Sequence, residues 1–176
     1  MRCLVSKLAG LVPGIAIALA MAGSPTPAQA SMSVVAFPNA GYSPGSIIVK
    51  TSERRLYFIL GDGRAQRFPV GVGMVGKRWT GFKRIERRMW EPDWSPPAEV
   101  KHDIPSLPNL IRGGTPANPI GVAALVLTGG DYAIHGTNRP QSVGGFVSYG
   151  CIRRYNSDST RLFAEVRVGT PVYVQP

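Results

Sequence analysis

The sequence Tyr132-Ala133-Ile134-His135-Gly136-Thr137, followed further along by Ser148-Tyr149-Gly150-Cys151-Ile152-Arg153, contains the residues that decide how this chain folds and which chemistry it can perform. His135 and Cys151 each adjoin a glycine, and the intervening Gly144-Gly145 pair favours a turn. Such a turn can bring the two short segments side by side. We therefore expect the thiol and the imidazole to share one site on adjacent strands or loop ends.

A cysteine beside a histidine is the minimal pair for acyl transfer. The imidazole takes the thiol proton, and the resulting imidazolium then holds the thiolate at neutral pH. Gly150 allows a tight backbone turn, so that successive N–H groups can point at an oxyanion. Arg153 can orient a substrate carboxylate through two hydrogen bonds. The alternative for Cys151 is a buried cysteine that acts only as a small apolar side chain.

Residues 1–30 have the pattern of a secretory signal peptide. Arg2 and Lys7 precede an apolar stretch, and Ala28-Gln29-Ala30 provides small residues at a cleavage site. A membrane anchor is the alternative, but the apolar stretch is short and is broken by proline and glycine. We expect cleavage after this site, which removes Cys3 and gives an exported protein of the periplasm or cell envelope without a stable membrane span.

The composition is that of one folded domain. In the full chain of 176 residues, 44% are hydrophobic and 17% are charged, which excludes a disordered chain. We assign residues 31–45, rich in proline, glycine and serine, to a linker and residues 46–176 to a single domain. Two cysteines and two histidines without a CxxC or HExxH motif exclude a structural zinc domain, and we expect no metal.

The fold class predicted is mostly β. One short helix is predicted after Asn156-Ser157-Asp158, with Asn156 or Asp158 as its N-cap and Gly169 at its end. The predicted strands are short β-prone runs at 47–49, 56–60, 66–70, 123–128, 132–135 and 172–174.

Two further stretches allow more than one interpretation. The proline-rich segment 90–120 is either an ordered loop packed through Trp90 and Trp94, forming one wall of a cleft, or a surface insertion, and we expect His102 within it to be exposed. Basic residues with interleaved aromatics over 77–88 favour an anionic envelope polymer as partner, since an exported protein rarely meets nucleic acid. The alternative is a solvated face.

Taken together, the residues around His135 and Cys151 resemble the signature of the L,D-transpeptidase catalytic domain family: His-Gly, an intervening stretch, then Ser-x-Gly-Cys-hydrophobic-Arg. The resemblance extends from about Ser46 to Val174. It implies a β-sandwich-like fold with a cleft, and an enzyme that works on peptidoglycan stem peptides. In that family a cysteine attacks the third stem residue, expels D-alanine, and passes the acyl group to another stem as a 3→3 cross-link.

The resemblance also implies a role for each site residue. Cys151 is the nucleophile, His135 the base, and the Gly136 carbonyl orients the imidazole. The N–H groups of Tyr149, Gly150 and Cys151 form the oxyanion hole. Arg153 and Ser148 make substrate contacts. No cofactor is implied, and carbapenems are implied as covalent inhibitors.

Three positions depart from the family's pattern. Tyr149 stands where many members have a second histidine, and Arg154 replaces a common methionine, adding charge near the site. Trp79-Thr80-Gly81 replaces a Thr-Pro-x-Gly run, so the shape of that loop cannot be inferred. The same site also suits a carboxypeptidase, an endopeptidase or an enzyme that anchors a protein to peptidoglycan, and a peptidoglycan-binding module is the non-enzymatic alternative.

Overall fold

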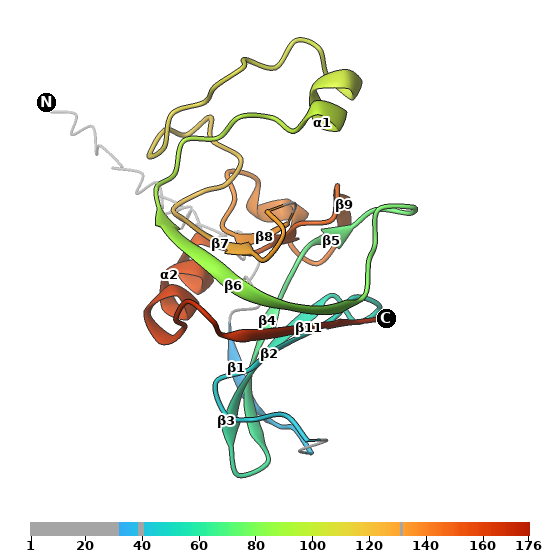
Figure 1. The fold of residues 1–176 in the computed structure, drawn as a ribbon, viewed down its shortest axis with the longest axis vertical. Helices are drawn as coiled ribbons and strands as arrows, with labels where there is room; N and C mark the ends of the chain where they lie inside the picture. The colour runs from blue at the N-terminus through green and yellow to red at the C-terminus, as the bar shows by residue number, and fades with distance from the viewer. Residues whose placement is uncertain (1–31, 39–40, 131) are drawn as a thin grey trace, which may run out of the picture.

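The computed structural model describes residues 32–38, 41–130 and 132–176 (Figure 1). The predicted signal peptide lies outside the described residues, and so does the first residue of the predicted linker. The elements are β1 (Ser33–Ala36), β2 (Ile47–Lys50), β3 (Arg55–Gly61), β4 (Arg64–Pro69), β5 (Val72–Gly73), β6 (Gly81–Trp90), α1 (Ala98–Asp103), β7 (Ala123–Leu127), β8 (Ala133–His135), the 3-10 turn η1 (Pro140–Ser142), β9 (Phe146–Ser148), β10 (Ile152–Arg153), α2 (Asn156–Glu165) and β11 (Pro171–Gln175).

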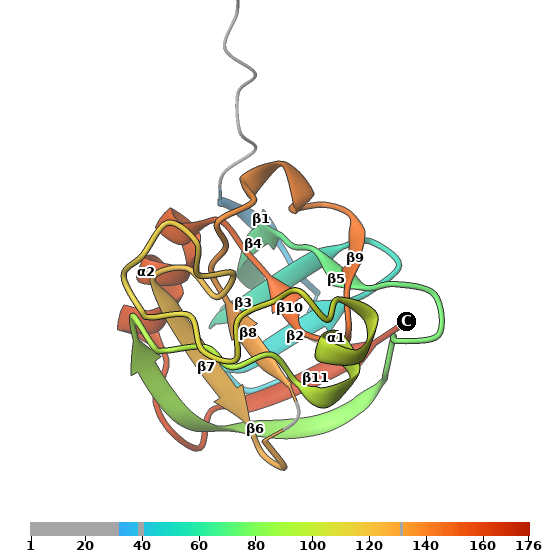
Figure 2. The ribbon, with the colours of Figure 1, turned by 90° about the horizontal axis from the view of Figure 1, so that it is seen from above.

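The long strand β6 joins the two halves of the main sheet. The strand order is β1-β4-β3-β2-β11-β6-β7-β8-β10, and β5 pairs separately with β9. Strand β6 is antiparallel to β11 on one side and to β7 on the other, with a register shift between Ile85 and Arg87. In Figure 2 it curves around the molecule, so that β7, β8 and β10 lie over β2 and β3. This arrangement confirms the mostly β, sandwich-like prediction.

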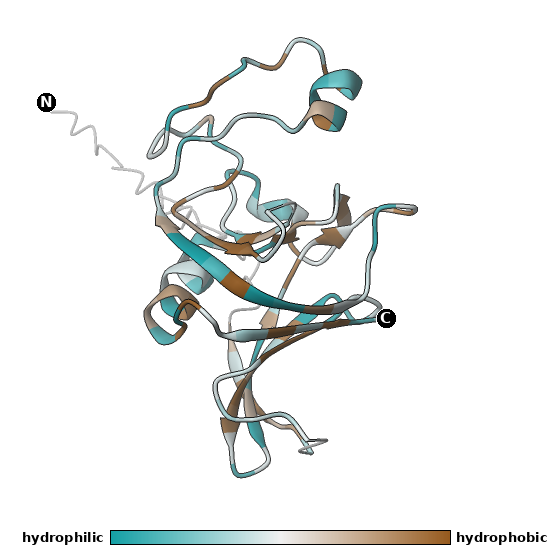
Figure 3. Ribbon diagram, in the orientation of Figure 1, coloured by the Kyte–Doolittle hydropathy of each residue, from teal (hydrophilic) through white to brown (hydrophobic). Residues whose placement is uncertain are grey.

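The main core lies between these two halves. It combines Ile47 and Phe58 from β2 and β3 with Leu125, Ile134 and Ile152 from β7, β8 and β10. In Figure 3 the strands are brown where they contribute such residues. The core takes Ile134 from β8 and Ile152 from β10. It therefore fixes both strands next to the site, since β8 ends at His135 and β10 begins directly after Cys151.

A second, smaller cluster covers the outer face of β2 to β4. Ile48, Tyr57 and Ile59 are buried there, with Val35 and Phe37 packed against them. Val35 belongs to β1, which pairs antiparallel with β4. The segment predicted as a linker therefore contains a strand, because its alternating apolar side chains cover an otherwise exposed part of the sheet.

The predicted strands are present, but β6 has no counterpart among them. Ile85 is its only fully buried side chain, and most of its other side chains are exposed. This strand therefore lacks the apolar alternation by which strands are recognised in sequence. The teal patches along β6 in Figure 3 are its charged residues.

The helix predicted after Cys151 is α2, but its N-cap differs from the prediction. Tyr155 occupies the cap position, and no side chain makes a capping hydrogen bond. Asn156 uses its side chain elsewhere, as described below. The helix ends at Glu165, before Gly169, whose N–H donates to the Ile85 carbonyl at 2.8 Å.

The proline-rich segment 90–120 is ordered by hydrogen bonds among its own residues, while Trp90, one of the two tryptophans expected to pack it, is exposed. Trp94 and Ile111 exchange backbone hydrogen bonds of 2.8 Å in each direction. The buried Asn118 amide donates to the Pro92 carbonyl at 2.9 Å. The segment also contains helix α1, a second helix that the sequence analysis does not predict, since none of its residues is buried.

Candidate active site

Strands β8 and β10 bring the predicted nucleophile and base together. They pair in parallel, with Ile152 opposite Ile134 and Arg153 opposite His135. Side chains alternate between the two faces of a sheet, and paired residues share a face. The two isoleucines face the core, so His135 and Arg153 lie on the opposite face. Cys151 directly precedes β10, where the Ala133 backbone and the charge of Arg153 act on its thiol.

The His135 ring is held by its own neighbour. Its Nδ1 lies 2.6 Å from the Gly136 carbonyl oxygen, and the side chain is buried. A carbonyl oxygen can only accept, so Nδ1 carries the proton in this contact. The neutral ring therefore has its lone pair on Nε2, the atom that a general base needs.

The protonation states of the pair differ from the expected ion pair. Burial, together with the charge of Arg153, lowers the pKa of His135 to about 4, although hydrogen bonds with the Gly136 and Ile120 backbone oppose this. Burial also raises the pKa of the Cys151 thiol, against smaller opposing effects of the Ala133 backbone and Arg153. At neutral pH the thiol therefore keeps its proton and the imidazole is neutral.

Ser148 holds the turn that presents Cys151. Its hydroxyl donates to the Cys151 carbonyl oxygen at 2.6 Å and accepts from the Gly150 N–H at 3.2 Å. The residue is buried. The predicted substrate contact at Ser148 does not fit this position, because the hydroxyl is already bound to the backbone. The predicted oxyanion role of the Gly150 N–H is corrected for the same reason, since that N–H points at Ser148.

The two neighbouring N–H groups remain candidates for an oxyanion hole. Neither the Tyr149 N–H nor the Cys151 N–H has an acceptor among the residues that the structure describes. Gly150 between them has φ +115°, a region that glycine enters without strain. The predicted tight turn at this glycine is therefore present.

Arg153 is placed beside the pair and is half-buried. Its Nη1 donates to Ser142 Oγ at 3.0 Å, and its backbone exchanges hydrogen bonds of 2.8 Å with Gly71. Its Nε is buried and has no partner within the described chain. A half-buried guanidinium whose charge acts on Cys151 can bind an anionic substrate group through its accessible atoms.

Arg154 points the other way. It is completely buried, its guanidinium lies 4.2 Å from the centre of the Phe68 ring, and Nη2 donates to the Asp158 carbonyl oxygen at 2.7 Å. Burial lowers the pKa of Arg154 to about 9. The expectation that Arg154 adds charge to the site is therefore wrong, since its side chain is buried in the interior.

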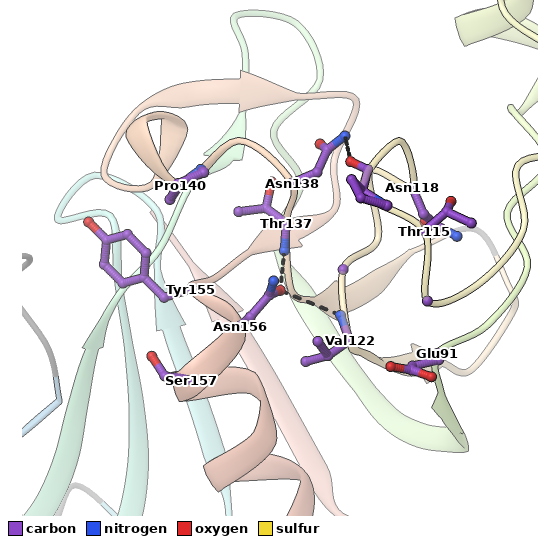
Figure 4. Close-up of a pocket in the computed structure, with 13 residues that line it drawn as sticks. Glu91, Thr115, Asn118, Val122, Thr137, Asn138, Pro140, Tyr155, Asn156 and Ser157 are labelled. Atoms are coloured by element: carbon purple, nitrogen blue, oxygen red, sulfur yellow. Dashed lines mark hydrogen bonds between the residues drawn. The ribbon is translucent and has the colours of Figure 1, made fainter.

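Asn156 fixes the backbone that follows His135. Its Oδ1 accepts from the Thr137 N–H at 2.9 Å and from the Val122 N–H at 3.4 Å, as Figure 4 shows. A cavity of about 550 Å³ opens beside these contacts, with Glu91 and Tyr155 also in its lining. The predicted catalytic residues do not line it, so this cavity is a neighbour of the site and not the site itself.

Helix α1 is tied to the cysteine turn by polar contacts. The Tyr149 hydroxyl donates to Asp103 Oδ2 at 2.7 Å. Lys77 pairs with Glu99 and lies 6.0 Å from the centre of the Tyr149 ring. His102, as expected, is exposed, with 88% of its side-chain surface accessible. The proline-rich loop therefore reaches the site through Tyr149.

Trp79 and Tyr132 are neighbours of the site that no sequence pattern predicts. Their rings stack with centroids 4.7 Å apart and planes 10° apart, and the Trp79 indole N–H donates to the Gly150 carbonyl oxygen at 2.9 Å. An aromatic residue interleaved with the basic run was the signal available for Trp79, but nothing local indicates its contact with Gly150.

Within residues 32–38, 41–130 and 132–176, no group of three or more histidine, cysteine, aspartate or glutamate side chains could hold a metal ion. None of the helices described is both long and apolar enough to cross a membrane.

The sequence of this chain matches a known protein family. Residues 44–174 match the YkuD model, described as the L,D-transpeptidase catalytic domain. The Escherichia coli K12 protein named "Probable L,D-transpeptidase YbiS" is 38% identical over 135 residues, which cover 72% of this chain and 43% of that protein. The Salmonella typhimurium protein named "Probable L,D-transpeptidase ErfK/SrfK" is 36% identical over 137 residues, which cover 73% of this chain and 43% of that protein. The chain thus spans about two fifths of the length of these relatives.

A solved structure shares the fold. L,D-transpeptidase 3 from Mycobacterium tuberculosis, in complex with a faropenem-derived adduct, aligns with a TM-score of 0.59 at 17% identity, covering 74% of this chain and 60% of that one. The family model covers most of the chain, and the relatives exceed a third identity over most of its length. This chain therefore belongs to the L,D-transpeptidase catalytic domain family.

Proposed function

We propose that this protein is an exported cysteine L,D-transpeptidase that forms 3→3 cross-links between peptidoglycan stem peptides. The observation that supports the proposal is the parallel pairing of β8 with β10, in which His135 is opposite Arg153 and Cys151 directly precedes the paired residues, with the Gly136 carbonyl on Nδ1 of the imidazole. Family membership supports the same reaction class.

In the first half-reaction, Cys151 attacks the carbonyl of the third residue of a tetrapeptide stem. His135 Nε2 takes the thiol proton as the sulfur–carbon bond forms, and the oxyanion is bound by the Tyr149 and Cys151 N–H groups. The bond to the terminal D-alanine then breaks. The same imidazole returns the proton to the departing amine, which leaves a thioester on Cys151.

In the second half-reaction, an amine from another stem attacks the thioester carbonyl. His135 takes a proton from this amine and returns one to the sulfur as the thioester breaks. The product has a new amide bond, and the enzyme regains its thiol. We propose that Arg153, whose side chain is half-buried and whose charge acts on Cys151, binds a carboxylate of the donor stem.

Two further proposals follow from the family. A faropenem-derived adduct is present in the M. tuberculosis relative, which supports carbapenems and related β-lactams as covalent inhibitors that acylate Cys151. A cell-wall substrate also supports export to the periplasm or envelope, in agreement with the signal-peptide pattern of residues 1–30.

The test is to incubate the purified protein lacking residues 1–30 with stem-tetrapeptide muropeptides and to separate the products by mass. Cross-linked dimers together with free D-alanine are expected. Tripeptides alone would identify water as the acceptor, and a peptide–protein conjugate formed only in the presence of an added protein amine would identify anchoring. An unchanged substrate would overturn the enzyme proposal in favour of a binding module.

The matched control is Cys151→Ala. We expect turnover to be lost while the thermal midpoint stays close to that of the parent protein, because one small side chain replaces another. A Cys151→Ala protein with full activity would contradict the thioester mechanism.

A further inference from the structure

The carbonyl of Gly150, in the turn that presents Cys151, is held by a side chain from a distant loop. Trp79 lies between β5 and β6, and its indole N–H donates to this carbonyl oxygen at 2.9 Å. The same loop contacts the turn a second time, where the Met74 N–H donates to the Ser148 carbonyl at 2.9 Å. The loop is therefore fixed along the turn at two points.

The indole itself is held by stacking. The Tyr132 ring lies parallel to it at 4.7 Å, and the Lys83 ammonium lies 5.8 Å from the Trp79 ring and 5.7 Å from the Tyr132 ring. A side chain added at Gly150 would overlap the Tyr132 ring. Trp79, Tyr132 and Gly150 thus form one packed unit behind the cysteine.

The hydrogen bond to Gly150 has a consequence for the next N–H. The Gly150 carbonyl and the Cys151 N–H belong to the same peptide plane, which is trans, so they point in opposite directions. With the carbonyl held by Trp79, the Cys151 N–H is directed away from the indole. The preceding peptide is fixed separately, because its N–H points at Ser148 Oγ.

We propose that Trp79 is a positioning residue that keeps the Cys151 N–H directed at the oxyanion of the acyl-transfer reaction. This inference rests on the proposed function. Gly150 has φ +115° and no side chain, so the peptide that follows it can rotate at little steric cost once its carbonyl is released. The indole N–H supplies the restraint that the glycine lacks, and the Cys151 N–H is lost as an oxyanion donor without it.

The test compares Trp79→Phe with the parent protein. Phenylalanine keeps a ring to stack on Tyr132 but has no N–H donor. Two reactions of Cys151 are measured: acylation by faropenem and by the stem tetrapeptide, which passes through an oxyanion, and alkylation by iodoacetamide, which does not. Tyr132→Phe, which leaves the stacked ring in place, is the matched control.

We expect the acylation rate constant and kcat of Trp79→Phe to fall at least tenfold, toward the factor of about 10²–10³ that follows loss of an oxyanion donor. KM and the alkylation rate are expected to stay within about twofold, and the Tyr132→Phe control to acylate like the parent. The thermal midpoint of each variant shows that it is folded.

Three outcomes overturn the inference. Unchanged acylation in Trp79→Phe removes the positioning role. An equal fall in acylation and alkylation shows that the indole acts on the thiol or on the fold instead. A parent protein that neither releases D-alanine nor reacts with faropenem overturns the proposed function, and the inference with it, and this result is visible before any variant is compared.

Discussion

Arg153 lies opposite His135 across the parallel pair of β8 and β10, and its charge acts on both members of the thiol–imidazole pair. It lowers the pKa of His135, in addition to the larger effect of burial. It also lowers the pKa of Cys151, against the larger effect of burial. One guanidinium therefore favours the neutral form of the His135 imidazole and the ionised form of the Cys151 thiol.

The pH dependence of the reaction should reflect the lowered pKa of His135. The base must be neutral, so activity is lost as the pH falls through about 4, instead of near the ordinary value of 6.5. Between pH 6.5 and about 4, His135 binds a proton in the unfolded chain but not in the folded protein. The free energy of unfolding therefore also decreases as the pH is lowered through this interval. We expect kcat/KM from pH 4 to 8 to keep its plateau down to about 5. An acid limb at 6.5 in a protein still folded by circular dichroism would contradict the buried neutral imidazole.

Replacing Arg153 should shift this profile in a defined direction. Arg153→Gln removes the charge, so the pKa of His135 rises and the acid limb moves to higher pH. The pKa of the thiol rises as well, which slows iodoacetamide alkylation at pH 7. Arg161→Gln, on the exposed side of α2, removes an equal charge as a control and should move neither. An acid limb that stays in place in Arg153→Gln would show that burial alone sets the imidazole.

Gly150→Ala and Gly144→Ala form a matched pair for the cysteine turn. Both glycines have positive φ, but an added methyl group at Gly144 meets open space, whereas at Gly150 it overlaps the Tyr132 ring. Urea unfolding should show a loss of about 1–2 kcal/mol for Gly144→Ala from the backbone alone. Gly150→Ala should lose more stability and most of its acylation by faropenem. Equal losses in the two variants would mean that packing against Tyr132 is unimportant.

Tyr149→Phe should release helix α1 from the turn. The variant removes the hydroxyl that donates to Asp103 but keeps the ring under Lys77. Backbone amides of α1 are expected to exchange hydrogen faster, because the helix has no buried residue to hold it. Amides of β8 should be unchanged and serve as the internal control. If exchange in α1 is the same in both proteins, the Lys77–Glu99 pair is sufficient to hold the helix.

The sequence predicts the parts of this protein that depend on local pattern. The apolar runs of β2, β3 and β7 predict strands, and the residues around Cys151 indicate the reaction class. Strand β6 was missed because it buries only Ile85 fully, and α1 because contacts such as that of Asp103 with Tyr149, not an apolar face, connect it to the domain.

The site itself shows the same division. The contact of His135 with the Gly136 carbonyl involves adjacent residues and could be inferred from the family resemblance. The burial of Arg154 and the contact of Trp79 with Gly150 depend on how distant segments pack. No local pattern distinguishes an arginine that enters the core from one that faces the substrate.

The position of β11 in the sheet has a consequence for how the protein acquires its structure. This strand, although late in the chain, lies between β2 and β6, parallel to the first and antiparallel to the second. Residues 171–175 must therefore be available before the two halves of the sheet can join. Val172 and Val174 of this strand also belong to the main core, so a chain lacking residues 171–175 can complete neither the sheet nor the core.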